Sequence, residues 1–208
     1  MEKRAVDLLQ NLEKRNIQGF YCVDKSAAVD KILEMIPATS SIGASGSQTL
    51  EQLGIIERLA GRGNKVISHI KPGISQKESL ELRRQATLAD YYLASANAVS
   101  VKGELVFFSA YGNRISGISY ANKAIVICGI NKLTANISDA LKRAREYAAP
   151  LNCKRLNWNT PCFQNGICRE DICLFPGYKR MCCQQLIIEA EAIPDRLKVI
   201  LVGENLGF

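Results

Sequence analysis

Residues 40–50 read Ser40-Ser41-Ile42-Gly43-Ala44-Ser45-Gly46-Ser47-Gln48-Thr49-Leu50 and decide the fold class. The stretch begins as a short strand that ends at Ile42, continues as a loop of glycine and hydroxyl residues, and enters a helical stretch from Leu50 to Leu59. Direct strand-to-helix connections are typical of chains in which strands and helices alternate around a mostly parallel sheet. We therefore expect an α/β fold.

The same alternation extends to both sides of this stretch. A hairpin is expected over residues 98–108, because strand-like runs flank Lys102-Gly103. Asn136 or Ser138 is expected to cap a helix that reaches Tyr147 and is followed by Pro150. Residues 1–208 are thus predicted to form one α/β domain with a mostly parallel, layered sheet. Further expected strands lie at 20–23, 66–68, 91–94, 124–128, 186–188 and 199–202, and further expected helices at 5–16, 26–36 and 75–88.

Composition places the chain among ordinary globular proteins. It has 208 residues, of which 47% are hydrophobic and 23% charged, and this balance excludes disorder, collagen and coiled coil. No apolar run approaches the roughly 20 residues that span a bilayer, and the amino terminus lacks an apolar signal region. We expect a cytoplasmic protein with no membrane partner, although export by a route that the sequence does not show stays open.

The net charge of +7 does not indicate a nucleic-acid binder. The 27 lysine and arginine residues are scattered along the chain in pairs such as Arg83-Arg84, and no run of five or more occurs. Nucleic-acid binders usually concentrate their positive charge on one face, often with interleaved aromatic residues. The basic excess fits an anionic small molecule as partner, or simply a solvated surface that keeps the protein soluble.

Cysteine is unusually abundant near the carboxyl terminus. Six of the eight cysteines fall within residues 153–183, a segment with little periodicity that we expect to be a loop inside the domain. Without a secretory signal, such a cluster indicates metal or redox chemistry before disulfides. Zinc or an iron–sulfur cluster, free thiols, and disulfides formed on oxidation all stay open. The proposed ligands are drawn from Cys162, Cys168, Cys173, Cys182 and Cys183.

Two segments could bind a ligand. In the loop that follows Ile42, glycines would let backbone amides approach an anion at a helix start, and Ser45, Ser47 and Thr49 add hydroxyl donors. In the second segment, residues 97–114, Glu104 is the only carboxylate, and Gly112-Asn113-Arg114 combines an amide with a guanidinium. The alternatives are a turn that uses glycine for backbone reasons and a solvated surface hairpin. His69 is expected to be a packed or partly exposed side chain.

These segments resemble the LUD (lactate utilisation, formerly DUF162) family. The resemblance covers nearly the whole chain and implies a fold similar to the ribose-phosphate isomerase, glucosamine-phosphate deaminase and CoA-transferase group. It is carried by residues 41–50, 89–98, 103–106, 112–114, 160–183 and the ending Val199-Ile200-Leu201-Val202-Gly203-Glu204-Asn205-Leu206-Gly207-Phe208.

The resemblance also implies site residues and partners. It makes Glu104 the candidate catalytic carboxylate, although Ser109-Ala110 stands where relatives have an acidic residue and a glycine, which puts a two-carboxylate mechanism in doubt. It implies a role in lactate or related organic-acid utilisation beside iron–sulfur redox subunits. A stand-alone enzyme acting on a phosphorylated or CoA-linked substrate, a sensor of such a ligand and a homo-oligomer stay open. The implied anion-binding residues are Gly43, Ser45, Gly46, Ser47, Thr49, Asn97, Asn113, Arg114 and Lys132.

Overall fold

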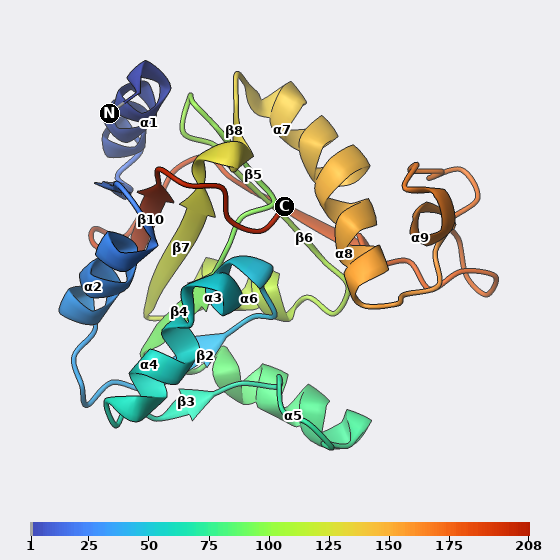
Figure 1. Ribbon diagram of the computed structural model, residues 1–208, viewed down its shortest axis with the longest axis horizontal. Helices are drawn as coiled ribbons and strands as arrows, with labels where there is room; N and C mark the ends of the chain where they lie inside the picture. The colour runs from blue at the N-terminus through green and yellow to red at the C-terminus, as the bar shows by residue number, and fades with distance from the viewer. Residues whose placement is uncertain (1) are drawn as a thin grey trace.

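A parallel sheet of six strands forms the centre of the molecule (Figure 1). The computed structural model describes residues 2–208. Every pair of neighbouring strands in this main sheet runs parallel, which confirms the mostly parallel α/β fold. In spatial order the strands are β1 (Gln18–Cys22), β10 (Leu197–Val202), β7 (Lys123–Gly129), β4 (Tyr91–Ala94), β2 (Ile42–Ala44) and β3 (Val66–Ile67).

The sequence of β7 explains its central place. All of its residues except Lys123 are buried. Ala124, Val126 and Cys128 pack on one face of the sheet, whereas Ile125 and Ile127 pack on the other. A continuous apolar run of this kind is typical of a parallel strand that is covered on both faces.

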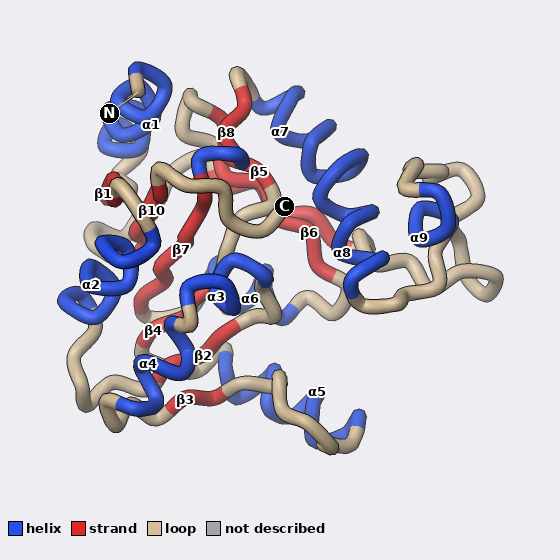
Figure 2. The backbone as a smooth tube through the Cα atoms, viewed as in Figure 1, coloured by secondary structure: helices blue, strands red, loops and turns tan. Residues whose placement is uncertain are grey.

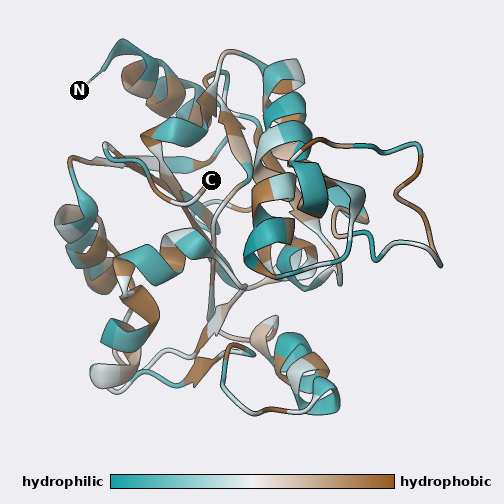
Figure 3. Cartoon of the chain, turned by 45° about the vertical axis from the view of Figure 1, so that its right-hand side comes forward, coloured by the Kyte–Doolittle hydropathy of each residue, from teal (hydrophilic) through white to brown (hydrophobic). Residues whose placement is uncertain are grey.

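Helices cover both faces of the main sheet, and Figure 3 shows that these helices carry both hydrophilic and hydrophobic residues. Leucines at helical spacing, such as Leu8 and Leu12, turn one side of an amphipathic helix toward the sheet. One face carries α2 (Lys25–Met35), α3 (Gln48–Leu53) and α4 (Ile55–Gly61), and the other carries α1 (Lys3–Lys14), α5 (Gln76–Ala86) and α6 (Asn113–Tyr120).

A smaller sheet of four strands packs beside the main one. Its strands, in spatial order, are β8 (Leu133–Thr134), β5 (Ala98–Ser100), β6 (Leu105–Ser109) and β9 (Gln184–Ile188). The antiparallel pairing of β5 with β6 confirms the expected hairpin, and β6 also pairs antiparallel with β9. A short 3₁₀ turn, η1 (Ile130–Lys132), joins β7 to β8.

Two expected helix boundaries are wrong. The helix predicted over residues 50–59 is two helices, because Gly54 adopts a left-handed conformation (φ 60°) between α3 and α4. Pro150 does not follow the end of a helix: α7 (Ile137–Arg143) continues through a π-helical segment, η2 (Ala144–Ala148), into α8 (Ala149–Arg155). Pro150 directly follows the π-helical segment, where the regular α-helical hydrogen-bond pattern is already interrupted. Asn136, as expected, caps α7.

The cysteine-rich segment extends from the body of the molecule beyond α8 (Figure 2). The expectation of a loop throughout residues 153–183 is wrong in two places, because the segment begins in the last turn of α8 and contains a short helix, α9 (Pro161–Asn165). The described residues between α9 and β9 form a loop. Within residues 2–208, no helix combines the length and the apolar character that crossing a bilayer requires.

Candidate functional site

A cavity of about 490 Å³ opens at the carboxyl edge of the main sheet. Three of its lining residues lie shortly after neighbouring strands: Ser45 comes directly after β2, His69 comes two residues after the end of β3, and Asn97 comes three residues after the end of β4. The carboxyl ends of parallel strands meet at one edge of a sheet, and ligands of α/β proteins bind there. The opposite walls of the cavity come from α5, α6, α8 and the loops around them.

The cavity is strongly basic. Lys71, Arg83, Arg114 and Arg155 line it, whereas none of the described residues that line it is an aspartate or glutamate. Positive groups without a neutralising carboxylate create a potential that attracts anions.

Arg114 is held at the centre of this basic wall. Gly112, in a left-handed conformation (φ 79°), turns the chain into α6 and places Arg114 in its first turn. The guanidinium donates to the carbonyl oxygen of Gly46 at 2.7 Å and to Oδ1 of Asn97 at 3.4 Å. These contacts join the ends of β2 and β4 through one side chain, so the loop predicted to bind an anion is fixed in place by a cation.

Three buried polar atoms of the cavity residues have no hydrogen-bond partner within the described chain. They are Oγ of Ser45, Nδ1 of His69 and Nε of Arg114. The great majority of buried polar groups in proteins have a hydrogen-bond partner, and each exception needs an explanation. Their gathering in one cavity favours a site that receives polar atoms from a ligand.

The basic surroundings change the charge of His69. Burial, followed by the positive charges of Arg83 and Arg114, lowers the pKa of His69 to about 4. Its imidazole is therefore neutral at pH 7. Burial also lowers the pKa of both guanidiniums, which nevertheless stay protonated because their ordinary pKa lies above 12.

Aromatic side chains form another part of the wall. Tyr111 and Trp158 meet edge to face with ring centroids 6.0 Å apart, and both line the cavity with Phe108. The guanidinium of Arg83 lies 4.8 Å from the ring centre of Tyr111 and donates to Oδ1 of Asn113. The site thus combines positive charge with an apolar surface, which suits an organic anion better than an inorganic one.

A second, smaller cavity of about 30 Å³ surrounds Lys132. The Lys132 ammonium is buried and donates to Oγ1 of Thr49 at 3.0 Å, Oγ of Ser95 at 2.8 Å and the carbonyl of Ala96 at 3.2 Å. Burial lowers its pKa to about 8. These contacts satisfy the three donors of Lys132, so it joins η1 to α3 and to the loop that follows β4. It reaches a ligand only by giving up one of these hydrogen bonds.

The predicted anion loop is divided between several roles. Gly46 lines both cavities, and Ser47 and Thr49 line the smaller one. The hydroxyl of Ser47 also caps α3 by accepting from the backbone N–H of Leu50 at 3.4 Å. Gly43 lines neither cavity, because it packs against α5: an added Cβ would lie 1.9 Å from the carbonyl oxygen of Ala86.

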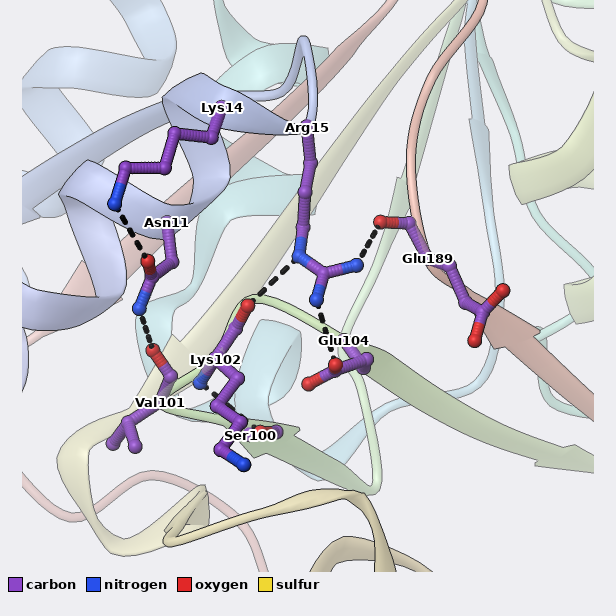
Figure 4. A network of polar contacts seen from close by, with 8 residues as sticks. All are labelled: Asn11, Lys14, Arg15, Ser100, Val101, Lys102, Glu104 and Glu189. Atoms are coloured by element: carbon purple, nitrogen blue, oxygen red, sulfur yellow. Dashed lines mark hydrogen bonds and ion pairs between the residues drawn. The ribbon is translucent and has the colours of Figure 1, made fainter.

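The structure does not bring Glu104 to this site (Figure 4). Glu104 stands at the turn end of the β5–β6 hairpin, where its carboxylate accepts a hydrogen bond from Arg15 at 2.7 Å. Asn97 and Ser109, at the opposite end of the same hairpin, line the large cavity. Glu104, the candidate catalytic carboxylate, therefore does not line either cavity, because the two strands of the hairpin carry it to the end opposite Asn97 and Ser109.

Hydrogen bonds and nearby positive charges favour the ionised form of Glu104. Burial acts to raise the pKa of Glu104, but the hydrogen bond with Ser100 and the charge of Arg15 outweigh it and hold the pKa below its ordinary value. Oε2 of Glu104 has no partner within the described chain. Arg15 further donates to the carbonyl groups of Lys102 and Glu189, so this network joins α1 to the hairpin and to β9.

The cysteines lie beyond the aromatic wall. Four of the five predicted metal ligands, Cys162, Cys168, Cys173 and Cys182, line one small cavity, and Cys153 joins them there. Cys183 is exposed and does not line that cavity. Across residues 2–208, no three cysteine, histidine, aspartate or glutamate side chains are already arranged as the ligands of a metal ion.

Sequence reasoning missed several residues of the large cavity. His69 and Lys71 could have been found, because they follow the expected strand at 66–68 just as Ser45 follows the strand before it. Arg83 and Arg155 carry no such signal. They come from α5 and α8, and only the packing of these helices brings them to the sheet edge.

Comparison with known proteins agrees with this architecture. The family model of the LUD domain matches residues 7–202. The crystal structure of a DUF162 family protein from Deinococcus radiodurans is similar to this chain, with a TM-score of 0.53 and 11% identity, over 96% of this chain and 98% of that one. At this identity the likeness bears on the fold alone. No curated protein matches the chain. The family match spans nearly the whole sequence, and the chain therefore belongs to the LUD domain family.

Proposed function

We propose that this LUD protein binds an anionic small molecule in the large cavity and serves the utilisation of lactate or a related organic acid. The observation that carries the proposal is the charge of the cavity: Arg83, Arg114, Arg155 and Lys71 line it without a described carboxylate. The LUD family is linked to lactate utilisation, and 2-hydroxy acids are anions at neutral pH.

The polar groups of the cavity match such a ligand. A carboxylate would lie against the guanidinium groups, because two N–H donors of arginine fit two carboxylate oxygens. The unpartnered Oγ of Ser45 and Nδ1 of His69 supply further hydrogen bonds for a hydroxyl or keto oxygen. The aromatic rings of Tyr111 and Trp158 would cover the carbon chain of the ligand.

Partners that carry electrons belong to the same proposal. Oxidation of a 2-hydroxy acid to a 2-keto acid releases two electrons and two protons, so the pathway needs an acceptor. We expect iron–sulfur redox subunits in this role. The alternative of a stand-alone sugar-phosphate or CoA-linked enzyme has less support, because its candidate carboxylate, Glu104, lies outside the cavity.

Calorimetric titration of the full chain tests the ligand class. L-lactate, pyruvate, inorganic phosphate and ribose 5-phosphate serve as probes, and we expect lactate or pyruvate to bind most tightly. Arg83→Gln should weaken that binding about 10- to 100-fold, since a charge-assisted hydrogen bond contributes about 1.5–3 kcal/mol.

Arg84→Gln is the matched control, because Arg84 neighbours Arg83 on α5 but is exposed, pairs with Glu81 and lines only an adjoining cavity, not the one that contains Ser45 and His69. Its affinity should equal that of the native chain. Equal affinities of Arg83→Gln and the native chain would remove the cavity from the function. Tighter binding of ribose 5-phosphate would support the sugar-phosphate alternative instead.

A further inference from the structure

Five thiols surround one small cavity in the cysteine-rich segment. Cys153 comes from α8, Cys162 from α9, and Cys168, Cys173 and Cys182 from the loops that follow. These positions span 30 residues of sequence, from 153 to 182, so a local turn does not explain their meeting. All five are free cysteines.

The size of the cavity limits what it can hold. Its volume is about 20 Å³, whereas one water-sized sphere occupies roughly 10–15 Å³. The cavity as it stands accepts about one such sphere, the space of a single ion. Thiolates are soft ligands, and a set of four around one ion is typical of structural zinc.

Positive side chains stand around the thiols. Arg145 and Arg180 both line the cavity, and both contact the carboxylate of Glu170. The Arg180 guanidinium also donates to the carbonyl oxygen of Cys182 at 3.4 Å. Four thiolates around one Zn²⁺ carry a net charge of −2, which nearby guanidinium groups would offset.

The segment has little apolar packing of its own. Ile167, Leu174 and Phe175 are 57–68% exposed, and no helix or strand occurs among the described residues 166–183. An ordered loop needs some other source of free energy, and metal binding commonly supplies it in segments without a core.

We propose that Cys162, Cys168, Cys173 and Cys182 bind one zinc ion. Each thiol loses its proton on binding, so up to four protons pass to the solvent. Because no three of these groups are yet at ligand positions, binding draws the loop 166–182 inward around the ion. The sulfur of Cys153 lies 3.9 Å from that of Met181, and we assign it to packing. Met181 and Cys182 line both this cavity and the large one, so the ion would also fix a wall of the ligand site.

Metal analysis of the full chain tests the proposal. The protein is purified under reducing conditions without chelator, and its metals are measured by plasma mass spectrometry. We expect about one zinc per chain. Replacement of zinc by Co²⁺ should give the intense visible bands of tetrahedral cobalt and a thiolate-to-cobalt charge-transfer band.

Cys168→Ser and Cys173→Ser should lose zinc and the cobalt bands, whereas Cys183→Ser, which alters an exposed thiol outside the cavity, should keep both. Far-UV circular dichroism tests whether each variant is folded. If Cys168→Ser unfolds, stoichiometric titration of the native chain with Co²⁺ still decides the matter.

Several results would overturn the proposal: no zinc in the native chain together with no uptake of Co²⁺, equal zinc in Cys168→Ser and Cys183→Ser, or iron with acid-labile sulfide in place of zinc. None of them bears on anion binding at Arg83, so a failure here is distinguishable from a failure of the proposed function.

Discussion

At the scale of single residues, the environment of His69 links ligand binding to protonation. Burial and the charges of Arg83 and Arg114 hold the pKa of its imidazole at about 4. A bound anion would oppose those positive charges and raise this pKa. The complex would then hold a proton that the free protein releases, at every pH between about 4 and the raised value.

We therefore expect sulfate to bind more tightly as the pH falls from 7.5 to 5. Uptake of a proton on binding means that affinity increases as protons become more available. Calorimetry at the two pH values measures the change, and sulfate is suitable because it stays fully ionised throughout this range. His69→Gln should remove the pH dependence while preserving the volume of the side chain approximately. If the affinity of His69→Gln for sulfate changes with pH as much as that of the native protein, His69 is not the group that takes up the proton.

At the scale of elements, the Arg15–Glu104 pair fixes the β5–β6 hairpin against α1. The side chains are 26% and 12% exposed, so the pair is partly shielded from water. Glu104→Gln should lower the free energy of unfolding at pH 7 by about 1–3 kcal/mol, as expected for loss of a charge-assisted hydrogen bond. Urea unfolding followed by circular dichroism measures this.

The same ion pair predicts that the free energy of unfolding depends on pH. The pKa of Glu104 is depressed in the folded state, so its contribution is fully present above the ordinary carboxyl value and is lost as the pH falls through the folded pKa. The difference in the free energy of unfolding between the native protein and Glu104→Gln should thus shrink below pH about 4.5. Glu81→Gln, which alters an exposed pair with Arg84, should change the unfolding free energy by less than about 0.5 kcal/mol at any of these pH values. If the difference in the free energy of unfolding between the native protein and Glu104→Gln stays constant down to pH 3, the ionised Glu104 does not stabilise the fold.

At the scale of the whole molecule, Arg196 joins distant parts of the chain. It precedes β10 and pairs with Glu191, and the two side chains are 8% and 7% exposed. Its guanidinium also donates to the carbonyl oxygens of Ile118 at 2.9 Å and Ala121 at 3.2 Å, at the end of α6.

Arg196→Met should destabilise the protein by about 3–5 kcal/mol, because it leaves the buried carboxylate of Glu191 without its partner. The comparison is with Arg169→Met, which removes an exposed pair with Asp171 and should cost less than about 0.5 kcal/mol. Thermal and urea unfolding of both variants check this. If Arg196→Met lowers the free energy of unfolding by less than about 1 kcal/mol, the buried pair of Arg196 and Glu191 does not stabilise the fold as expected.

Local pattern alone was sufficient for much of the architecture. Continuous apolar runs such as 124–128 predict strands buried on both faces, and Lys102-Gly103 between two apolar runs predicts the hairpin. Placement after a strand indicated that Ser45 and Gly46 lie at the edge of the sheet, where both line the large cavity. These features depend on neighbours in sequence, which is why the sequence determines them.

The remaining features depend on tertiary packing. Ser47 looks the same in sequence whether it meets a ligand or caps α3, and Glu104 looks the same whether it faces the cavity or Arg15, 89 residues away. Arg83 and Arg155 enter the site only because α5 and α8 pack at one edge of the sheet. The sequence was sufficient to infer a LUD-like α/β chain with a dense group of cysteines, but the order of the strands in the sheet came from the structure. Which charges meet in the cavity was decided by the tertiary structure, because it depends on contacts between residues far apart along the chain.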